Sequence, residues 1–144
     1  MSDNPNVSAE SAIAALLSIM ARLRDPDGGC PWDLKQDFDS IVPYTVEEAF
    51  EVAEAVARRD YPELKEELGD LLLQVVFHSQ MAREQGLFDF SEVVAVLNDK
   101  MVRRHPHVFG DQTAEDEQAV KVNWEAIKAE ERARKGREHD SALD

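Results

Sequence analysis

The fold of this chain is decided by residues 45–85, TVEEAFEVAEAVARRDYPELKEELGDLLLQVVFHSQMAREQ. Apolar residues recur in this stretch at spacings of three and four, which is the period of an amphipathic helix. The pattern restarts at Asp60-Tyr61-Pro62-Glu63, where an aspartate can cap a new helix that has proline in its first turn. We therefore expect two helices, at about 45–59 and 62–85, joined by a very short loop and packed as antiparallel neighbours.

Signals at the ends of these helices indicate their boundaries. Thr45-Val46-Glu47-Glu48 has the pattern of a capping box, so we expect the first helix to begin near Thr45. Gly86 is a natural C-terminal stop for the second helix, because glycine readily adopts the left-handed conformation that ends many helices.

Each of the two helices carries an acidic signature, Glu48-Ala-Phe-Glu51 and Glu67-Leu-Gly-Asp70. Side chains at positions i and i+3 of a helix are neighbours, so each signature places two carboxylates on one face. An antiparallel hairpin brings the signatures together, and four like charges repel strongly unless a cation lies between them. Hard oxygen ligands without Cys or His suit Mg²⁺, Mn²⁺ or Ca²⁺.

Two plainer interpretations of these acids stay open at this point. The carboxylates could form a solvated acidic face, as most charged runs do, or Glu48 could serve as the capping-box partner of Thr45. Against a purely solvated face, Glu67 is flanked by Leu64, Leu68 and Leu71 on its own side of the helix. Carboxylates at the edge of an apolar stripe are costly unless they are paired or bound to metal.

The rest of the chain is also helical in pattern. We expect a first helix at about 8–24, ended by the turn Asp25-Pro26-Asp27-Gly28-Gly29, and an irregular connection over 30–43. A fourth helix should be capped by Asp89 or Ser91 and run to about Arg104, followed by a loop over 106–112 and a last helix from about Thr113 to Lys135. No segment shows strand alternation, so the predicted fold class is all-α, an antiparallel helical bundle.

Domain organisation and composition limit the function. We expect a single domain over 8–135, with flexible termini at 1–7 and 136–144. The chain has 144 residues, of which 43% are apolar, so it can bury a core. Lys plus Arg is 16 and Asp plus Glu is 30, a net charge of −14. That charge argues against duplex nucleic acid or an anionic membrane as the main partner, because both attract basic surfaces.

Other features of the sequence favour a cytoplasmic protein. Cys30 is the single cysteine, so no intrachain disulfide can form. Residues 1–6 are polar and lack a signal-peptide pattern, and no apolar run approaches the ~20 residues that span a bilayer. The longest apolar stretch, Leu71 to Phe77, is interrupted by Gln74.

A basic run, Lys100-Met101-Val102-Arg103-Arg104-His105, stands out in so acidic a chain. It could complement the dipole of its helix, or it could capture phosphate, since Arg matches phosphate oxygens with two parallel hydrogen bonds. Trp124 and Lys128, four residues apart, could contact a base and a phosphate, or could simply help to dock the last helix. Lys35 could equally lie on the surface or face a substrate.

Several common site types lack support in the sequence. His105 and His107 have no matching Cys or carboxylate spacing for a soft metal, and no Glu-x-x-His occurs, which counts against a di-iron bundle. Gly28-Gly29 is not followed by the Lys-Ser/Thr of a phosphate-binding loop. Cys30, beside Pro31, has no obvious base partner and is expected to be structural.

Four motifs together resemble the MazG nucleoside triphosphate pyrophosphohydrolases. They are Cys30-Pro31-Trp32-Asp33, Tyr44-Thr45-Val46-Glu47-Glu48, Lys65-Glu66-Glu67-Leu68-Gly69-Asp70 and Arg103-Arg104-His105-Pro106-His107-Val108-Phe109. The resemblance covers roughly 13–128, and the combination is specific although each motif alone is weak. Many members of this family carry two such domains and this chain holds one, so an excised domain and a naturally short form are both open.

The resemblance implies an all-α NTP pyrophosphatase fold completed by homodimers or higher oligomers, and a function. That function is Mg²⁺-dependent hydrolysis of nucleoside triphosphates to monophosphate and pyrophosphate, with Mn²⁺ as a substitute metal. The implied metal ligands are Glu48, Glu51, Glu67 and Asp70, and the further acids of the catalytic set are Glu47 and Glu66. The implied substrate contacts are Tyr44, Lys35, Lys65, Lys100, Arg103, Arg104, Trp124 and Lys128.

Alternatives to a broad-specificity house-cleaning enzyme also follow. A narrower pyrophosphatase for dUTP, dCTP or a modified nucleotide would use the same fold. A catalytically weak or silent module that binds metal or nucleotide and regulates a partner would keep the same motifs. A plain structural bundle with a solvated acidic face would show no Mg²⁺-dependent change in thermal stability.

Overall fold

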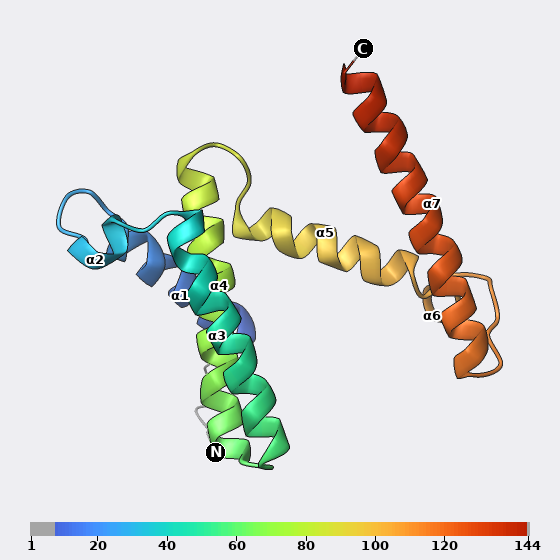
Figure 1. Cartoon of the computed structure of the whole chain (residues 1–144), viewed down its shortest axis with the longest axis horizontal. Helices are drawn as coiled ribbons and strands as arrows, with labels where there is room; N and C mark the ends of the chain where they lie inside the picture. The colour runs from blue at the N-terminus through green and yellow to red at the C-terminus, as the bar shows by residue number, and fades with distance from the viewer. Residues whose placement is uncertain (1–7, 144) are drawn as a thin grey trace. The chain divides into compact units, whose positions relative to one another are not determined.

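The computed structural model describes residues 8–143, which form helices and turns with no strand among them. The predicted all-α class is therefore confirmed for this part of the chain. The predictions for 1–7 and for Asp144 lie outside the described residues. The helices are α1 (Ala9–Leu23), α2 (Pro31–Leu34), α3 (Phe38–Ala57), α4 (Tyr61–Glu84), α5 (Phe90–Arg103), α6 (Pro106–Phe109) and α7 (Glu117–Leu143) (Figure 1). The chain divides into two compact units, Met1–Ser91 and Glu92–Asp144.

The first unit is built on the hairpin of α3 and α4, which lie side by side (Figure 1). Arg59, with a φ of 56°, turns the chain between them, and the Asp60 side chain accepts a hydrogen bond from the Glu63 N–H to cap α4. The capping prediction for Asp60 is thus confirmed. Gly86 has a φ of 71° just after α4, which confirms it as the stop.

Positions equally distant from Arg59 face one another along this hairpin, and we call them the hairpin seam. The seam pairs Ile41 with Phe77, Tyr44 with Gln74, Glu48 with Asp70, and Glu51 with Glu67. On each helix these positions are three or four residues apart, which is the spacing of one helix face. The short connection between Ala57 and Tyr61 therefore brings the two acidic signatures to one level, as the sequence predicts.

The core of the first unit lies at the end of the hairpin away from Arg59, where α1 packs against α4. Its fully buried members are Met20 from α1, Ile41 from α3, and Val76, Phe77 and Met81 from α4. Around them pack the partly buried Leu16, Leu17, Phe38, Leu73 and Phe90. The other end of the hairpin receives little cover within this unit.

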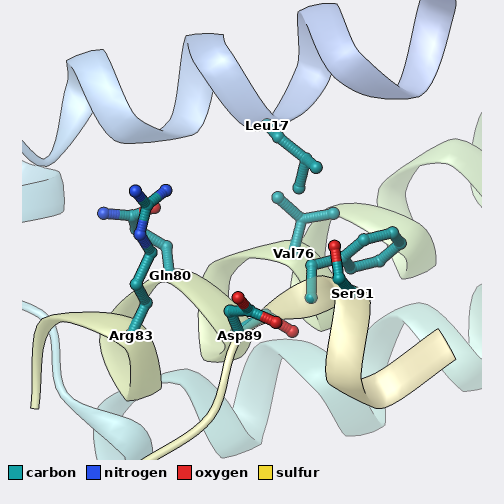
Figure 2. A pocket seen from close by; sticks show the side chains of 8 residues that line it. Leu17, Val76, Gln80, Arg83, Asp89 and Ser91 are labelled. Atoms are coloured by element: carbon teal, nitrogen blue, oxygen red, sulfur yellow. The ribbon is translucent and has the colours of Figure 1, made fainter. Parts of the chain in front are cut away.

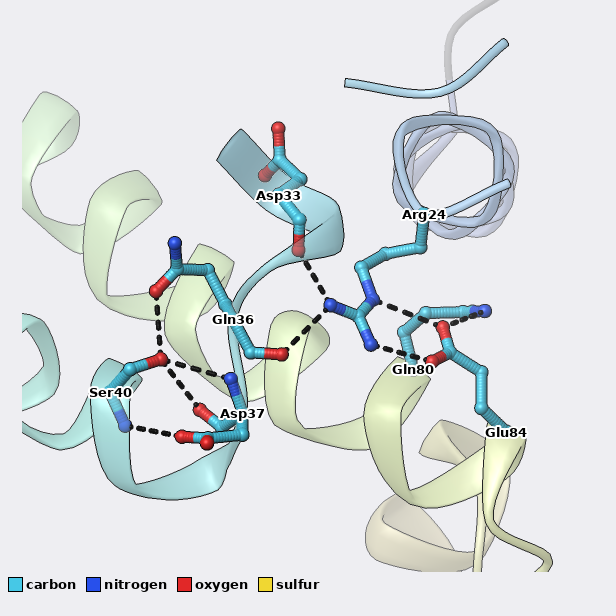
Figure 3. Close-up of polar contacts among 7 residues, drawn as sticks. All are labelled: Arg24, Asp33, Gln36, Asp37, Ser40, Gln80 and Glu84. Atoms are coloured by element: carbon cyan, nitrogen blue, oxygen red, sulfur yellow. Dashed lines mark hydrogen bonds and ion pairs between the residues drawn. The ribbon is translucent and has the colours of Figure 1, made fainter. Parts of the chain in front are cut away.

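The start of α3 differs from the sequence prediction. The helix begins at Phe38 because Asp37 and Ser40 form a capping box with hydrogen bonds of 2.8 and 2.9 Å (Figure 3). Pro43 lies inside the helix, where the carbonyl it leaves free belongs to the exposed Asp39. Thr45 is then a mid-helix residue whose hydroxyl donates to the Ile41 carbonyl, so the predicted capping box at Thr45 is wrong.

Other boundaries were also mispredicted. Residues 31–34 are the short helix α2 within the expected irregular connection, and 106–109 are α6 within the expected loop. Helix α7 starts at Glu117 rather than near Thr113, because the Asp116 carboxylate accepts the Ala119 N–H at 2.9 Å. It also continues to Leu143, beyond the predicted end near Lys135.

Arg24, directly after α1, ties together three parts of the first unit (Figure 3). Its guanidinium donates to both carboxylate oxygens of Glu84 at 2.6 and 3.1 Å, and to the backbone carbonyls of Asp33 and Gln36. It also lies over the Phe77 ring at 5.7 Å from the centroid. Hydrogen bonds with Arg24 hold the pKa of the Glu84 carboxyl below its usual value.

We predict that Arg24→Met lowers the free energy of unfolding by about 2 kcal/mol, because it leaves Glu84 and two backbone carbonyls without their charged donor. Urea denaturation followed by circular dichroism measures this loss. Arg22→Met, at an exposed position in the last turn of α1, is the matched control and should change stability by less than about 0.5 kcal/mol. Equal losses in the free energy of unfolding for the two substitutions would contradict the role of Arg24 in stabilising the first unit.

Candidate functional site

Three carboxylates converge on the hairpin seam. Oxygen atoms of Glu48, Glu67 and Asp70 all lie within 4.8 Å of one another. Glu48 comes from α3, and Glu67 and Asp70 come from successive turns of α4. The structure thus brings together one member of the first acidic signature and both members of the second, which is three of the four carboxylates that the sequence predicts to converge.

Glu67 is the most perturbed member of this trio. Its side chain is buried, with 8% of the residue exposed, although its neighbours are other acids. Desolvation raises the pKa of the Glu67 carboxyl to about 7, with further contributions from the charges of Glu48, Glu51 and Glu63 and from a hydrogen bond with Asp70. With a pKa of about 7, the Glu67 carboxyl is protonated in about half of the molecules at pH 7 when no cation is bound.

Glu48 presents an unsatisfied oxygen to the same site. Its Oε2 is buried and has no hydrogen-bond partner among the described residues. Desolvation, and then the negative charges of Asp70, Glu47 and Glu51, raise the pKa of the Glu48 carboxyl. Because α3 begins at Phe38, Glu48 cannot be the capping partner of Thr45, so that alternative is excluded.

The geometry of the trio fits a divalent cation. Oxygens that bind one Mg²⁺ at about 2.0–2.1 Å lie at most about 4.2 Å apart, and the wider shell of Ca²⁺ allows about 5 Å. The observed limit of 4.8 Å therefore requires only small side-chain movements to close around an ion. An all-carboxylate donor set suits hard cations rather than soft ones.

The other predicted acids lie around this trio. Glu51 is half-buried and outside it, but its charge raises the pKa of both Glu48 and Glu67, so it lies close enough to act on the site. Glu47 is exposed and acts on Glu48 in the same way. Glu66 is exposed on α4.

The predicted basic cluster belongs to the second unit and is paired within it. Arg103 and Arg104, at the end of α5, bind the two oxygens of Glu131 on α7, each at 2.7 Å. Glu131 is buried, and its hydrogen bond with Arg104, together with the charges of Arg103, Arg104 and Lys100, lowers the pKa of its carboxyl. The sequence analysis missed Glu131, although it follows Trp124 and Lys128 at the spacing of one helix face.

Of the remaining predicted substrate contacts, some pack against neighbouring side chains and others are exposed. Trp124 packs edge-on against His105 at 5.3 Å between ring centroids, and its indole N–H is buried without a partner among the described residues. Lys128 lies 3.8 Å from Glu125 on the same helix. Lys35 and Lys65 are exposed. Tyr44 packs edge-on against Trp32 at 5.7 Å.

A small cavity of about 80 Å³ lies elsewhere in the first unit (Figure 2). Leu17 of α1, Gln80 and Arg83 of α4, and Ser91 at the start of α5 contribute to its walls. A water molecule needs roughly 10–15 Å³ by the same kind of measure, so this space suits a few waters rather than a nucleotide.

Comparisons with known proteins identify the family of this chain. The sequence model of the family described as the MazG nucleotide pyrophosphohydrolase domain matches residues 36–109. The chain belongs to the MazG family. The nucleoside triphosphate pyrophosphohydrolase of Escherichia coli (strain K12) is 57% identical over 132 residues, which are 92% of this chain and 49% of that protein. The nucleoside triphosphate pyrophosphohydrolase/pyrophosphatase MazG of Thermotoga maritima is 50% identical over 120 residues, 83% of this chain and 45% of that protein.

The fold comparison points to the same family. A crystal structure of a mazG-related protein from Thermotoga maritima superimposes with a TM-score of 0.66 and 27% sequence identity, covering 81% of this chain and 98% of the other. The predicted MazG-type fold is thereby confirmed. The chain spans about half the length of the curated MazG relatives it matches. No helix among the described residues is long and apolar enough to cross a membrane.

The raised pKa of Glu67 predicts a pH-dependent stability in metal-free protein. The native state binds a proton that the unfolded chain releases above its ordinary pKa of 4.5, so this group's contribution is fully present below 4.5 and is lost as the pH rises through about 7. As the pH rises from about 5 to about 8, the free energy of unfolding of Glu67→Gln should therefore increase relative to that of the unsubstituted protein, because only the unsubstituted protein loses this contribution. Urea titrations in EDTA across that range measure the difference.

Comparing Glu67→Gln with the unsubstituted protein also removes the opposing effect that His78 has on the pH dependence of stability. Burial lowers the pKa of His78, which makes stability rise with pH in the same region for both proteins, so it cancels in the difference. Added Mg²⁺ or Mn²⁺ should raise the melting temperature more at about pH 8 than at about pH 6, since proton and cation compete for Glu67. If the free energies of unfolding of the two proteins change with pH in parallel in EDTA, the raised pKa of Glu67 is contradicted.

Proposed function

We propose that this chain hydrolyses nucleoside triphosphates to the monophosphate and pyrophosphate in a Mg²⁺-dependent reaction, as a broad-specificity house-cleaning enzyme. The observation that carries the proposal is the convergence of Glu48, Glu67 and Asp70 with a buried, unpartnered oxygen on Glu48. The relatives named as nucleoside triphosphate pyrophosphohydrolases support the substrate and the reaction.

The acidic residues of the hairpin would have two roles, metal binding and proton acceptance. Glu48, Glu67 and Asp70, with Glu51 beside them, would hold the cation. Bound Mg²⁺ would neutralise the phosphate oxygens and position the attacking water. The water oxygen forms a bond to phosphorus as the anhydride bond between the α- and β-phosphoryl groups breaks, pyrophosphate departs, and a carboxylate accepts the water's proton. Glu47 and Glu66 are the candidates for that proton, since both are exposed acids on the helices that carry the trio.

The nucleotide contacts are proposed on the family resemblance. Arg matches phosphate oxygens geometrically and Lys supplies a point charge, so the basic residues would bind the triphosphate. Glu131 would keep the two arginines oriented between turnovers, because it binds one end of each guanidinium. The residues proposed for substrate contact are Tyr44, Lys35, Lys65, Lys100, Arg103, Arg104, Trp124 and Lys128.

Asp70→Asn should reduce NTP turnover more than about 100-fold, because even residues that only support metal ligands cost about 10- to 100-fold when changed. Glu54→Gln is the matched control, since Glu54 is an exposed acid on α3 that pairs with Arg58 on the surface. A panel of NTPs and dNTPs with Mg²⁺, with products separated by ion chromatography, measures the rates and the preference for base and sugar.

The products separate the alternatives. Pyrophosphate supports the proposed cleavage point, and orthophosphate contradicts it. Turnover restricted to dUTP or dCTP would indicate the narrower enzyme. Calorimetric binding of NTP and Mg²⁺ with no product would indicate the silent regulatory module, and absence of both would leave the structural bundle.

We also propose that the hairpin self-associates into homodimers or higher oligomers. Its surface carries two apolar stripes at helical spacing, Val42, Val46 and Phe50 on α3 and Leu68, Leu72 and Val75 on α4. Phe50 is 72% exposed, and large exposed apolar patches mark interaction surfaces.

Phe50→Glu combined with Leu68→Lys should shift the protein to a lower mass in sedimentation equilibrium, because it places charges on both stripes. Val122→Glu, at an exposed apolar position of α7, is the control and should leave the mass unchanged. A monomer at all concentrations before substitution would refute the proposed self-association.

A further inference from the structure

The second unit contains a buried carboxylate, Glu131 on α7, that binds two arginines at once. Only 9% of Glu131 is exposed. Its Oε1 lies 2.7 Å from Nη2 of Arg104, and its Oε2 lies 2.7 Å from Nη1 of Arg103. These are the lengths of charge-assisted hydrogen bonds. Arginine binds carboxylate and phosphate oxygens through the same N–H groups, so Glu131 stands where a phosphate oxygen would bind.

The nitrogens that Glu131 takes leave neither arginine with an edge that is free of carboxylate. A guanidinium offers two paired edges, Nε with Nη2 and Nη1 with Nη2. Because Nη2 belongs to both edges, a phosphate at either edge of Arg104 would meet the negative charge of Glu131. On Arg103, Glu131 takes Nη1, and Nε on the other edge lies 3.3 Å from a carboxylate oxygen of Asp99. A phosphate therefore has to displace Glu131 to bind both arginines bidentately.

The charges around Glu131 favour a ligand with more negative charge than one carboxylate has. A hydrogen bond with Arg104, and then the charges of Arg103, Arg104 and Lys100, hold the pKa of the Glu131 carboxyl below its usual value. Three cations thus act on one buried anion. Asp99 adds a second negative charge, but its side chain is 74% exposed and water weakens its effect.

Unsatisfied nitrogens in the same part of the chain point the same way. Nε of Arg104 and the indole Nε1 of Trp124 are buried and have no hydrogen-bond partner among the described residues. The Trp124 ring contacts His105, the residue next to Arg104, at 5.3 Å between centroids. Buried N–H groups without an acceptor are rare and costly. An anion with several acceptor oxygens would satisfy more of these donors than the two oxygens of Glu131 can.

We propose that Glu131 is an internal competitor for phosphate: its carboxylate neutralises Arg103 and Arg104 when no ligand is bound, and an incoming phosphate displaces it. The inference rests on the proposed function only in taking the two arginines as phosphate contacts. Every phosphate ligand breaks the same two ion pairs, so displacement weakens the binding of all of them by a similar factor. A triphosphate has enough further contacts to remain bound, whereas a monophosphate product has fewer and dissociates.

The plainer role for Glu131 is that of a brace, which would stay on the arginines while phosphate binds. The two roles predict opposite effects of removing its charge. Loss of a competitor strengthens phosphate binding, because the ligand no longer has to break two ion pairs. Loss of a brace weakens phosphate binding, because the guanidinium groups are no longer held in place. The direction of the change in affinity therefore decides between them.

Anion binding to the full chain in EDTA tests this without metal or turnover, with inorganic tripolyphosphate and orthophosphate as probes in isothermal titration calorimetry. Glu131→Gln keeps the size of the side chain and removes its charge, and it should bind both anions at least about tenfold more tightly. Glu130→Gln, at the exposed neighbouring position of α7, changes the net charge equally and should alter either affinity less than about twofold. Unchanged or weaker binding by Glu131→Gln would overturn the proposal.

A second measurement needs no substitution, in case Glu131→Gln disturbs folding. The ¹³Cδ resonance of the Glu131 carboxylate in the unsubstituted chain reports whether the ion pairs persist. Tripolyphosphate should move this resonance toward that of a glutamate without an arginine partner. A resonance that stays fixed while tripolyphosphate saturates the protein would identify Glu131 as a brace and overturn its role as competitor.

The outcomes separate this inference from the proposed function. Tighter anion binding by Glu131→Gln in a chain that turns over no NTP would leave the competitor and reject the enzyme. NTP turnover together with weaker anion binding by Glu131→Gln would leave the enzyme and overturn the competitor. Failure of both proteins to bind tripolyphosphate in EDTA would show that the arginines do not capture phosphate by themselves, which also overturns it.

Discussion

Mutual repulsion among the carboxylates of one hairpin is the constraint on which this site depends. The short turn at Arg59 forces Glu48 to the level of Asp70 and Glu51 to the level of Glu67. Neither helix can slide to relieve the repulsion without breaking the cap at Asp60 or the packing of Ile41, Phe77 and Met81 at the other end. The charges are thus held together by apolar burial and by a backbone turn that lie outside the site.

This arrangement explains why the acids lie where the hairpin has little other cover. The core of the first unit occupies the end of the hairpin that α1 contacts, and the acidic trio lies toward the turn. Burial of Glu67 is then limited to what its own hairpin provides, which is enough to raise its pKa to about 7 but leaves Asp70 exposed. A ligand can reach such a site, whereas a trio in the core would be closed.

The sequence predicted the hairpin, and the three acids that meet on it, because the signals for the hairpin are local. Helical period, an Asp-x-Pro start and a glycine stop act over a few residues, and the equal spacing of the two signatures from the turn follows from them. The start of α3 was mispredicted because two capping boxes compete, at Asp37 and at Thr45, and the pattern at Thr45 is the one that the sequence prediction followed. The packing of the first turn against the core, through Phe38 and Ile41, favours the earlier start, and no local pattern reveals it.

Non-local pairs account for the other residues that the sequence analysis missed. Glu131 binds Arg103 and Arg104 from another helix, and Arg24 binds Glu84 and the carbonyls around α2. Local sequence patterns cannot predict pairs between residues that are far apart in the sequence. Spacing gave a hint for Glu131, which shares a helix face with Trp124 and Lys128. Gln74 gave a different hint, as the polar residue that interrupts the apolar run from Leu71 to Phe77. Its amide is buried with one unsatisfied oxygen, which a structural role alone does not explain.

The order of residues along the hairpin seam connects these observations. From the core toward the turn, α3 presents Ile41, Tyr44, Glu48 and Glu51, while α4 presents Phe77, Gln74, Asp70 and Glu67. Both helices therefore change in the same order from apolar, through an aromatic or amide side chain, to carboxylate. Because the turn fixes the register of the two helices, a one-residue insertion in either helix between the turn and the acids would shift these levels against each other and move Glu48 away from Glu67 and Asp70.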